Sequence, residues 1–83
     1  MKKICSRVKT EYGEVLIYAY FKEERLYGIE ITLREANGVT VCRYARLFRR
    51  RIMARWFIRV LKKGRVYPQH LKDIAENFDY NML

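Results

Sequence analysis

The chain has 83 residues and a mass of 10.1 kDa, and it carries 18 lysines and arginines against 9 aspartates and glutamates, a formal net charge of +9. A chain of this length buries only about 60 to 65% of its unfolded surface, so we expect one domain without a large catalytic cleft. Apolar residues make up 51% of the sequence, beside one proline and four glycines, which is typical of a packed domain and excludes a disordered basic tail.

The positive charge is concentrated in the second half of the chain. Residues 36–72 contain eleven lysines or arginines and no acidic residue, whereas the rest of the chain has seven basic and nine acidic residues. Ten of the eleven lie between Arg43 and Arg65. Because like charges held together reduce folding stability, this region indicates an anionic partner, which the sequence leaves open among nucleic acid, anionic lipid and an acidic protein.

Other residue types argue against several classes of protein. Cys5 and Cys42 are too few for a disulfide scaffold, and one histidine does not complete a zinc site with them. Polar residues interrupt the apolar residues near the N-terminus, and no apolar run approaches the roughly 20 residues that span a bilayer. We therefore expect no secretory signal, no membrane span, no metal, no cofactor and a cytoplasmic location with reduced thiols. No membrane partner is expected either, because detaching the basic helix that carries Trp56 and Phe57 from the sheet would remove most of the core.

Alternation of apolar residues predicts strands in the first half of the chain. A first strand is predicted over residues 3–9, with Ile4, Ser6 and Val8 on one face. A second is predicted over residues 15–21, and because both of its faces are largely apolar, we expect it to be a central strand.

Two further strands follow. Polar residues 22–25 form the next reversal, and residues 27–33 then show the most regular alternation in the chain. The dipeptide Asn37-Gly38 favours the positive φ angles of a type I′ hairpin turn. A fourth strand is predicted from residue 39 to about residue 45.

The period changes to that of a helix after Leu47, and we expect this helix over about residues 49–63. Its apolar residues span an arc of roughly 240°, so it is predicted to lie mostly buried, with Trp56 and Phe57 covering the sheet. Gly64 is predicted to follow the C-cap.

A second, shorter helix is predicted over residues 68–77, with Pro68 in its first turn. The element order is then ββββαα. It predicts an α+β fold for the single domain 1–83: a four-stranded antiparallel meander with two helices packed on one face and a core over about residues 3–78.

Two segments carry a likeness to other proteins. They are Tyr27-Gly28-Ile29-Glu30-Ile31 and Val66-Tyr67-Pro68-Gln69-His70-Leu71-Lys72-Asp73-Ile74-Ala75-Glu76-Asn77-Phe78. Over most of residues 12–78 the chain resembles an uncharacterised family of small proteins from Gram-positive, largely anaerobic Firmicutes. The resemblance implies no activity, only a compact one-domain fold served by Gly28, Pro68, Leu71 and Asp73. Between Leu47 and Arg55 arginines replace the polar or acidic helix start of the family, which makes the basic region particular to this chain.

The arginines of the predicted first helix conflict with helix stability. Arg49, Arg50 and Arg51 lie at its expected start, where cations destabilise the helix by a few tenths of a kcal/mol or more each. Arg51, Arg55 and Arg59 follow at intervals of four residues, where like charges repel by about 0.2 to 0.5 kcal/mol per pair. A bound phosphate removes the conflict. The alternative, a solvated face of an apolar helix, does not explain the missing acids.

We therefore predict a noncatalytic nucleic-acid-binding protein that contacts mainly the phosphate backbone, because the guanidinium group matches phosphate bidentately. The predicted contact residues are Arg43, Arg46, Arg49, Arg50, Arg51, Arg55, Arg59, Lys62, Lys63 and Arg65. The alternative is a small protein–protein interaction module that binds an acidic surface, such as an inhibitor or regulator of a host nucleic-acid-binding protein encoded by a phage or another mobile element. An edge strand is a candidate for pairing into a homodimer.

The sequence contains two weaker indications of function. His70 and Asp73 lie one helical turn apart, but no nucleophile or glycine-rich phosphate loop accompanies them, so no catalytic residue is predicted. Tyr18, Tyr20 and Tyr44 offer a stacking platform for bases, although packing in the core or on a sheet face is the favoured role of these tyrosines.

Overall fold

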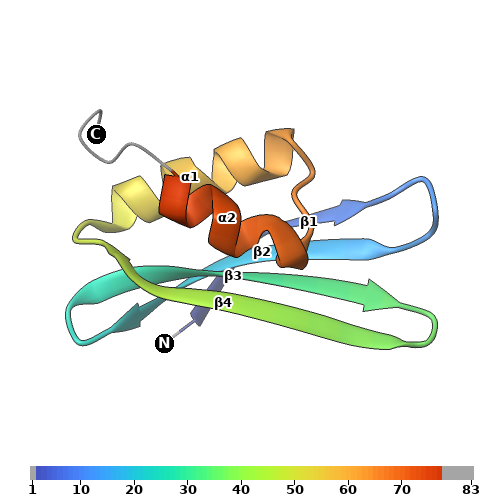
Figure 1. Ribbon diagram of the computed structural model, residues 1–83, viewed down its shortest axis with the longest axis horizontal. Coiled ribbons are helices and arrows are strands. Elements are labelled where there is room, and N and C mark those ends of the chain that lie inside the picture. Colours follow the sequence, from blue (N-terminus) through green and yellow to red (C-terminus); the bar gives the residue numbers. More distant parts are fainter. Residues whose placement is uncertain (1, 78–83) are drawn as a thin grey trace.

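The computed structural model describes residues 2–77, which form one antiparallel sheet with a layer of helices on one face (Figure 1). The elements are β1 (Lys2–Lys9), β2 (Val15–Glu23), β3 (Leu26–Glu35), β4 (Gly38–Phe48), α1 (Arg51–Lys63), the 3-10 helix η1 (Pro68–His70) and α2 (Leu71–Asn77). The predicted α+β class and the order of four strands and two helices are confirmed. Residue 78, the predicted end of the core, lies outside the described residues.

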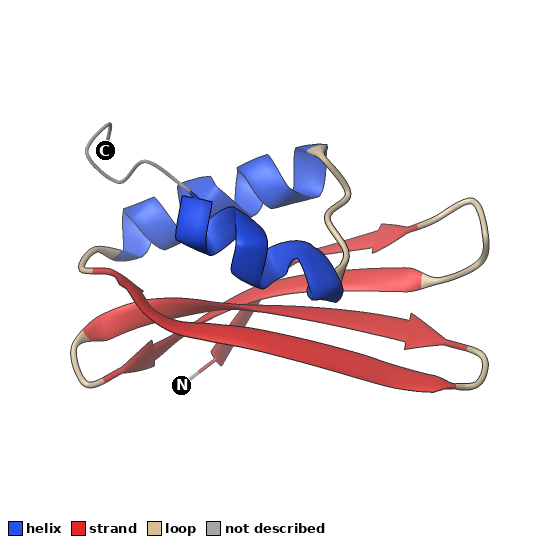
Figure 2. Cartoon of the chain, viewed as in Figure 1, coloured by secondary structure: helices blue, strands red, loops and turns tan. Residues whose placement is uncertain are grey.

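The four strands lie in the sheet in chain order, so β1 and β4 are its edges and β2 is central, as predicted. All three pairings are antiparallel. The helices cover one face only, and no described helix lies on the other (Figure 2). The fold therefore has two layers, and the side of α1 that points away from the sheet lies at the surface of the protein.

The type I′ geometry predicted for Asn37-Gly38 is wrong. Glu35 pairs with Gly38, so the two loop residues are Ala36 and Asn37. Neither of them has a positive φ, whereas Gly38 has a φ of 157°. Alanine does not readily adopt the positive φ that the first central residue of a type I′ turn needs. Two successive positive φ values occur instead in the β2–β3 hairpin, at Glu24 and Arg25.

A bulge divides β1 into two parts. Ile4 pairs with Ala19, whereas Ser6 pairs with Tyr18, and Cys5 is the extra residue between them. Because an extra residue moves the side chains that precede it to the opposite face, the predicted shared face of Ile4 with Ser6 and Val8 is wrong. The bulge lies on the edge of the sheet that α1 borders.

A second irregularity bends β4 toward α1. Tyr44 pairs with Ile29 and Phe48 pairs with Tyr27, so residues 45–47 all oppose Gly28. Arg46, in the middle of this bulge, has a φ of 59°. A Cβ atom on Gly28 would lie 2.6 Å from the Tyr44 carbonyl oxygen and 2.6 Å from Cζ of Phe21, so the bulge requires glycine at that position.

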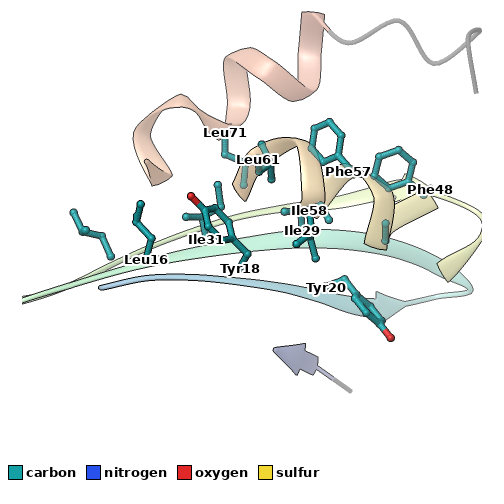
Figure 3. Packing of buried hydrophobic residues seen from close by; sticks show 12 residues of the cluster. Leu16, Tyr18, Tyr20, Ile29, Ile31, Phe48, Phe57, Ile58, Leu61 and Leu71 are labelled. Atoms are coloured by element: carbon teal, nitrogen blue, oxygen red, sulfur yellow. The ribbon is translucent and has the colours of Figure 1, made fainter. Parts of the chain in front are cut away.

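The core lies between the sheet and the helices (Figure 3). Its largest fully buried side chains include Tyr18, Tyr20, Phe57, Leu16, Ile29, Ile31, Leu61 and Leu71. The hydroxyl of Tyr18 donates a hydrogen bond of 3.0 Å to the Val66 carbonyl, and that of Tyr67 donates one of 2.6 Å to Glu14 Oε1. These two bonds attach the segment after α1 to β2 and to the β1–β2 turn.

The other face of the sheet is closed by long polar side chains. The guanidinium of Arg43 lies 4.1 Å from the centroid of the Phe21 ring, which is buried. Glu30, only 6% exposed, accepts contacts from Arg43 Nε at 2.9 Å and Lys2 Nζ at 3.0 Å. Paired charges and aliphatic stems therefore shield the apolar residues that no helix covers.

Helix α1 ends at Lys63 as predicted, but Gly64 does not have the predicted role. Gly64 is the C-cap itself, with a φ of −86°, and Arg65 adopts the left-handed conformation with a φ of 49°. The amides of Arg65 and Val66 donate to the carbonyls of Lys62 and Leu61, the pattern of a Schellman motif. An arginine thus occupies the position that glycine usually takes.

The Gly28→Ala substitution is expected to destabilise the protein by about 2 kcal/mol or more, because the methyl group meets backbone atoms that cannot move independently. Urea unfolding measures the loss. The matched control is Gly64→Ala, whose nearest neighbour is at 3.5 Å and which should change stability by less than about 0.5 kcal/mol. Equal stability of the two variants would contradict the close packing at Gly28.

Tyr18 gives the protein a pH dependence in the alkaline range. Burial raises the pKa of Tyr18 from its ordinary value of 10 to about 12. The stabilisation by the neutral phenol is therefore complete below pH 10 and is lost as the pH rises toward 12. We expect Tyr18→Phe to cost about 1 kcal/mol at neutral pH, through the lost hydrogen bond, and this difference to shrink above pH 10 in urea unfolding. A difference in unfolding free energy that stays constant above pH 10 would contradict the raised pKa of Tyr18.

Candidate nucleic-acid interface

Helix α1 packs on the sheet through a narrow stripe of four buried residues, Ala54, Phe57, Ile58 and Leu61. The prediction that α1 lies mostly buried is wrong, because Ile52, Trp56 and Val60 are 68%, 40% and 41% exposed. A two-layer fold supplies only one surface for α1 to pack against, so the rest of its apolar arc faces outward. These three residues, spaced by four, are called the apolar ridge below.

A row of cations runs beside the apolar ridge. Arg51, Arg55 and Arg59 repeat every four residues, so they lie on one side of α1, and Lys62 continues the row; all four side chains are exposed. These four residues are called the basic row below. The first turn of α1 contains no acidic residue, and Arg50, the N-cap, makes no capping hydrogen bond through its side chain. The conflict with helix stability that the sequence indicated is therefore present in the structure.

The basic row forms one wall of a groove between α1 and β1. One hollow of about 400 Å³ lies among Lys3, Ile4, Cys5, Tyr20, Arg51 and Arg55. A second, of about 200 Å³, continues past Cys5 and Arg55 to Arg59 and Lys62. Cys5, the bulged residue of β1, borders both hollows. The groove thus has cations on both walls, with Lys3 on the strand and the basic row on the helix.

Cys5 reflects the electrostatics of this groove. Partial burial raises the pKa of its thiol, while the nearby charges of Arg55 and Lys3 act in the opposite direction. The thiol is exposed and makes a long contact of 3.8 Å with the Lys3 carbonyl. The positive charges of the groove therefore offset only part of the effect of burial on this pKa.

The structure separates two of the ten predicted contact residues from the others. Arg43 lies on the far face of the sheet, paired with Glu30. Arg46 contacts the β2–β3 hairpin, with Nη2 3.0 Å from Glu24 Oε2 and 3.6 Å from Glu23 Oε1. Both side chains already have carboxylate partners, which reduces their availability to an external anion.

The other eight predicted residues have no carboxylate of residues 2–77 within ion-pair distance. They are Arg49, Arg50, Arg51, Arg55, Arg59, Lys62, Lys63 and Arg65, all exposed and all located on α1 or within two residues of its ends. Their positive charge is therefore uncompensated over one continuous element of the structure.

The tyrosine platform is wrong, and the favoured role in the core is confirmed for two of its members. Tyr18 and Tyr20 are almost fully buried, and Tyr44 is half-buried. The aromatic side chain that is exposed beside the cations is Trp56, which the sequence reasoning assigned to the core. The four-residue spacing of Trp56 from Ile52 and Val60 could have indicated this exposure. An apolar arc wider than the stripe that packs on the sheet leaves some of its residues outside the core.

His70 and Asp73 are the residues that the sequence offers as an acid/base pair. His70 and Asp73 are exposed at the start of the last helical segment, and no described hydrogen bond or ion pair joins them. No group of three histidine, cysteine, aspartate or glutamate residues within residues 2–77 is arranged to hold a metal ion. None of the described helices combines the length and the apolar character needed to cross a membrane.

Comparison with known proteins returns no match to the chain, whether among family models, curated proteins or solved structures. The resemblance to small Firmicutes proteins therefore stays a prediction from its two motifs.

Arg51→Glu is expected to stabilise the protein by about 0.3 to 1 kcal/mol, since it places an anion in the first turn of α1 and removes one repulsive pair with Arg55. Thermal unfolding at low salt measures the gain, which should shrink at high salt because the charges are exposed. Arg34→Glu, in an exposed position of β3, is the control for a change of net charge alone. A lower stability of Arg51→Glu would contradict the described conflict.

Proposed function

We propose that the protein is a noncatalytic nucleic-acid-binding protein of the cytoplasm that contacts mainly the phosphate backbone. One observation carries the proposal: the basic row and the cations around it have no carboxylate partner in residues 2–77, whereas Arg43 and Arg46 do. Arg43 and Arg46 thus have carboxylate partners within the chain, whereas the eight neighbouring cations along α1 and at its ends are left uncompensated. A polyanion supplies the missing negative charge.

Phosphate is the anion that this surface fits best. Arginine offers a planar fork of donors that matches phosphate oxygens, and six of the eight cations without a carboxylate partner on α1 and at its ends are arginines. Successive members of the basic row rise by about 6 Å along the helix axis, which suits an anion with repeated charges better than a single one. Contacts of this kind carry little sequence information, so we expect weak sequence preference.

An acidic protein surface is the second candidate, and the apolar ridge is the observation that favours it. Exposed tryptophan and arginine side chains are typical of protein interfaces, and Ile52 and Val60 add apolar area. In this role the protein is an interaction module, such as an inhibitor or regulator carried by a phage or another mobile element. The free edges β1 and β4 are in addition candidates for pairing between two copies.

Fluorescence anisotropy with labelled oligonucleotides, over a series of salt concentrations, tests the first proposal. The logarithm of the affinity should fall linearly with the logarithm of the salt concentration, by about 0.7 to 0.9 per phosphate contacted. Arg55→Glu should weaken binding at low salt by about tenfold or more and lower the slope by about 1. Arg34→Glu, which makes the same charge change in an exposed position on β3, should have a much smaller effect.

Two results would contradict nucleic-acid binding through α1. One is the absence of affinity even at low salt, and the other is an equal loss of affinity in Arg55→Glu and Arg34→Glu, which would indicate a response to net charge alone. A pull-down before and after nuclease treatment separates the two candidates, because a protein partner bound directly survives the nuclease.

A further inference from the structure

A third hollow, on the outward side of α1, is not explained by phosphate contacts alone. It has a volume of about 280 Å³ and is lined by Ile52, Arg55, Trp56 and Arg59. Two of its residues belong to the apolar ridge and two to the basic row, so apolar and cationic surfaces meet within about two turns of the helix. A phosphate alone contacts only the cationic residues of such a site and leaves the apolar ones unused.

The chemistry of this hollow matches a nucleotide. A nucleobase has a flat apolar face that stacks on an aromatic ring, and the phosphate attached to its sugar accepts hydrogen bonds from guanidinium groups. Trp56 provides the ring, with 40% of the residue exposed, and Arg55 and Arg59 flank it. Ile52 adds an apolar contact on one side of the same hollow.

We propose that the nucleic acid bound by this protein is single-stranded, with one base stacked on Trp56 and the adjoining phosphates on Arg55 and Arg59. The inference rests on the proposed function and specifies its ligand. The strand runs along α1, so that the basic row and Lys3 contact phosphates on the side of the groove, while the apolar ridge contacts bases.

A duplex does not fit this surface equally well. In B-form DNA the base faces are stacked inside the helix, and a protein reaches only base edges and the charged backbone. Ile52, on the outward side of α1, would then lie against sugars and phosphates, and the exposed part of the Trp56 ring would meet no base face. A single strand presents its base faces, which every base has, so the stacking is also tolerant of sequence.

A second copy of the chain is a poor occupant of the same hollow. Packing α1 against α1 brings two basic rows together, and none of their cations has a carboxylate partner in residues 2–77. An acidic amphipathic helix of another protein satisfies both the charge and the apolar ridge, and it is therefore the rival outcome that the experiment has to recognise.

The experiment compares an oligothymidylate with an abasic oligonucleotide that has the same number of phosphates. Both contact the basic row, but only the oligothymidylate offers bases. We expect the oligothymidylate to bind about tenfold or more tightly than the abasic strand, the size of effect that one stacked base gives. We also expect it to bind more tightly than the duplex of the same length, and to quench the emission of Trp56, the only tryptophan in the sequence.

Substitutions of Trp56 separate stacking from general apolar contact. Trp56→Phe keeps an aromatic face and should retain most of the affinity for oligothymidylate, whereas Trp56→Leu keeps apolar area without a ring and should lose about tenfold. Neither variant should change the affinity for the abasic strand by more than about twofold. Tyr12→Ala, at an exposed aromatic residue in the β1–β2 turn, is the control and should bind like the wild type.

The outcomes distinguish this inference from the proposed function. If oligothymidylate, abasic strand and duplex bind alike and Trp56→Leu has no effect while Arg55→Glu does, the stacking inference is wrong and backbone binding stands. If no oligonucleotide binds but an acidic amphipathic peptide does, with loss in Trp56→Leu, both proposals are wrong and α1 docks a protein.

Discussion

The packing of α1 against β2 and β3 is the interaction on which the rest of the structure depends. Four buried side chains, Ala54, Phe57, Ile58 and Leu61, fix the rotation of the helix about its axis. That rotation decides at once that the basic row borders β1 and that the apolar ridge points outward. Within residues 2–77 α1 packs on the sheet through this one stripe, and the residues of the ridge remain partly exposed. The candidate site is thus a direct result of how the core is built.

Arginines occupy several positions where the backbone favours other residues. Arg50 is an N-cap, a place for serine or aspartate, and Arg51 lies in a first turn that prefers acids. Arg46 and Arg65 adopt left-handed conformations that suit glycine or asparagine, at a cost of about 1 kcal/mol each. Arg46 recovers part of this through Glu23 and Glu24. The arginines around α1 lower the stability of the fold, which is expected where positive charge at that surface is needed for binding.

The sequence predicted the four strands, the two helices and their order, since alternation and helical period are local properties of the chain. It did not predict the bulges at Cys5 and at residues 45–47, because a bulge is defined by the partner strand, which local patterns do not describe. It identified the basic row but assigned Trp56 to the core, since a helical wheel shows the width of an apolar arc and not how many neighbours cover it. Similarly, the pairings of Arg43 and Arg46 depend on contacts across the sheet.

The strand order has a consequence for how the chain folds. Each strand pairs with its neighbour in sequence through a short turn, so the sheet grows by closing small loops, and loop-closure entropy stays low. The contacts of α1 with β2 and β3 span a longer stretch of chain and follow only once those strands are paired. We expect rapid folding with a transition state centred on the β2–β3 hairpin, in which the positively charged helix docks last and its mutual repulsion mainly affects the rate of unfolding.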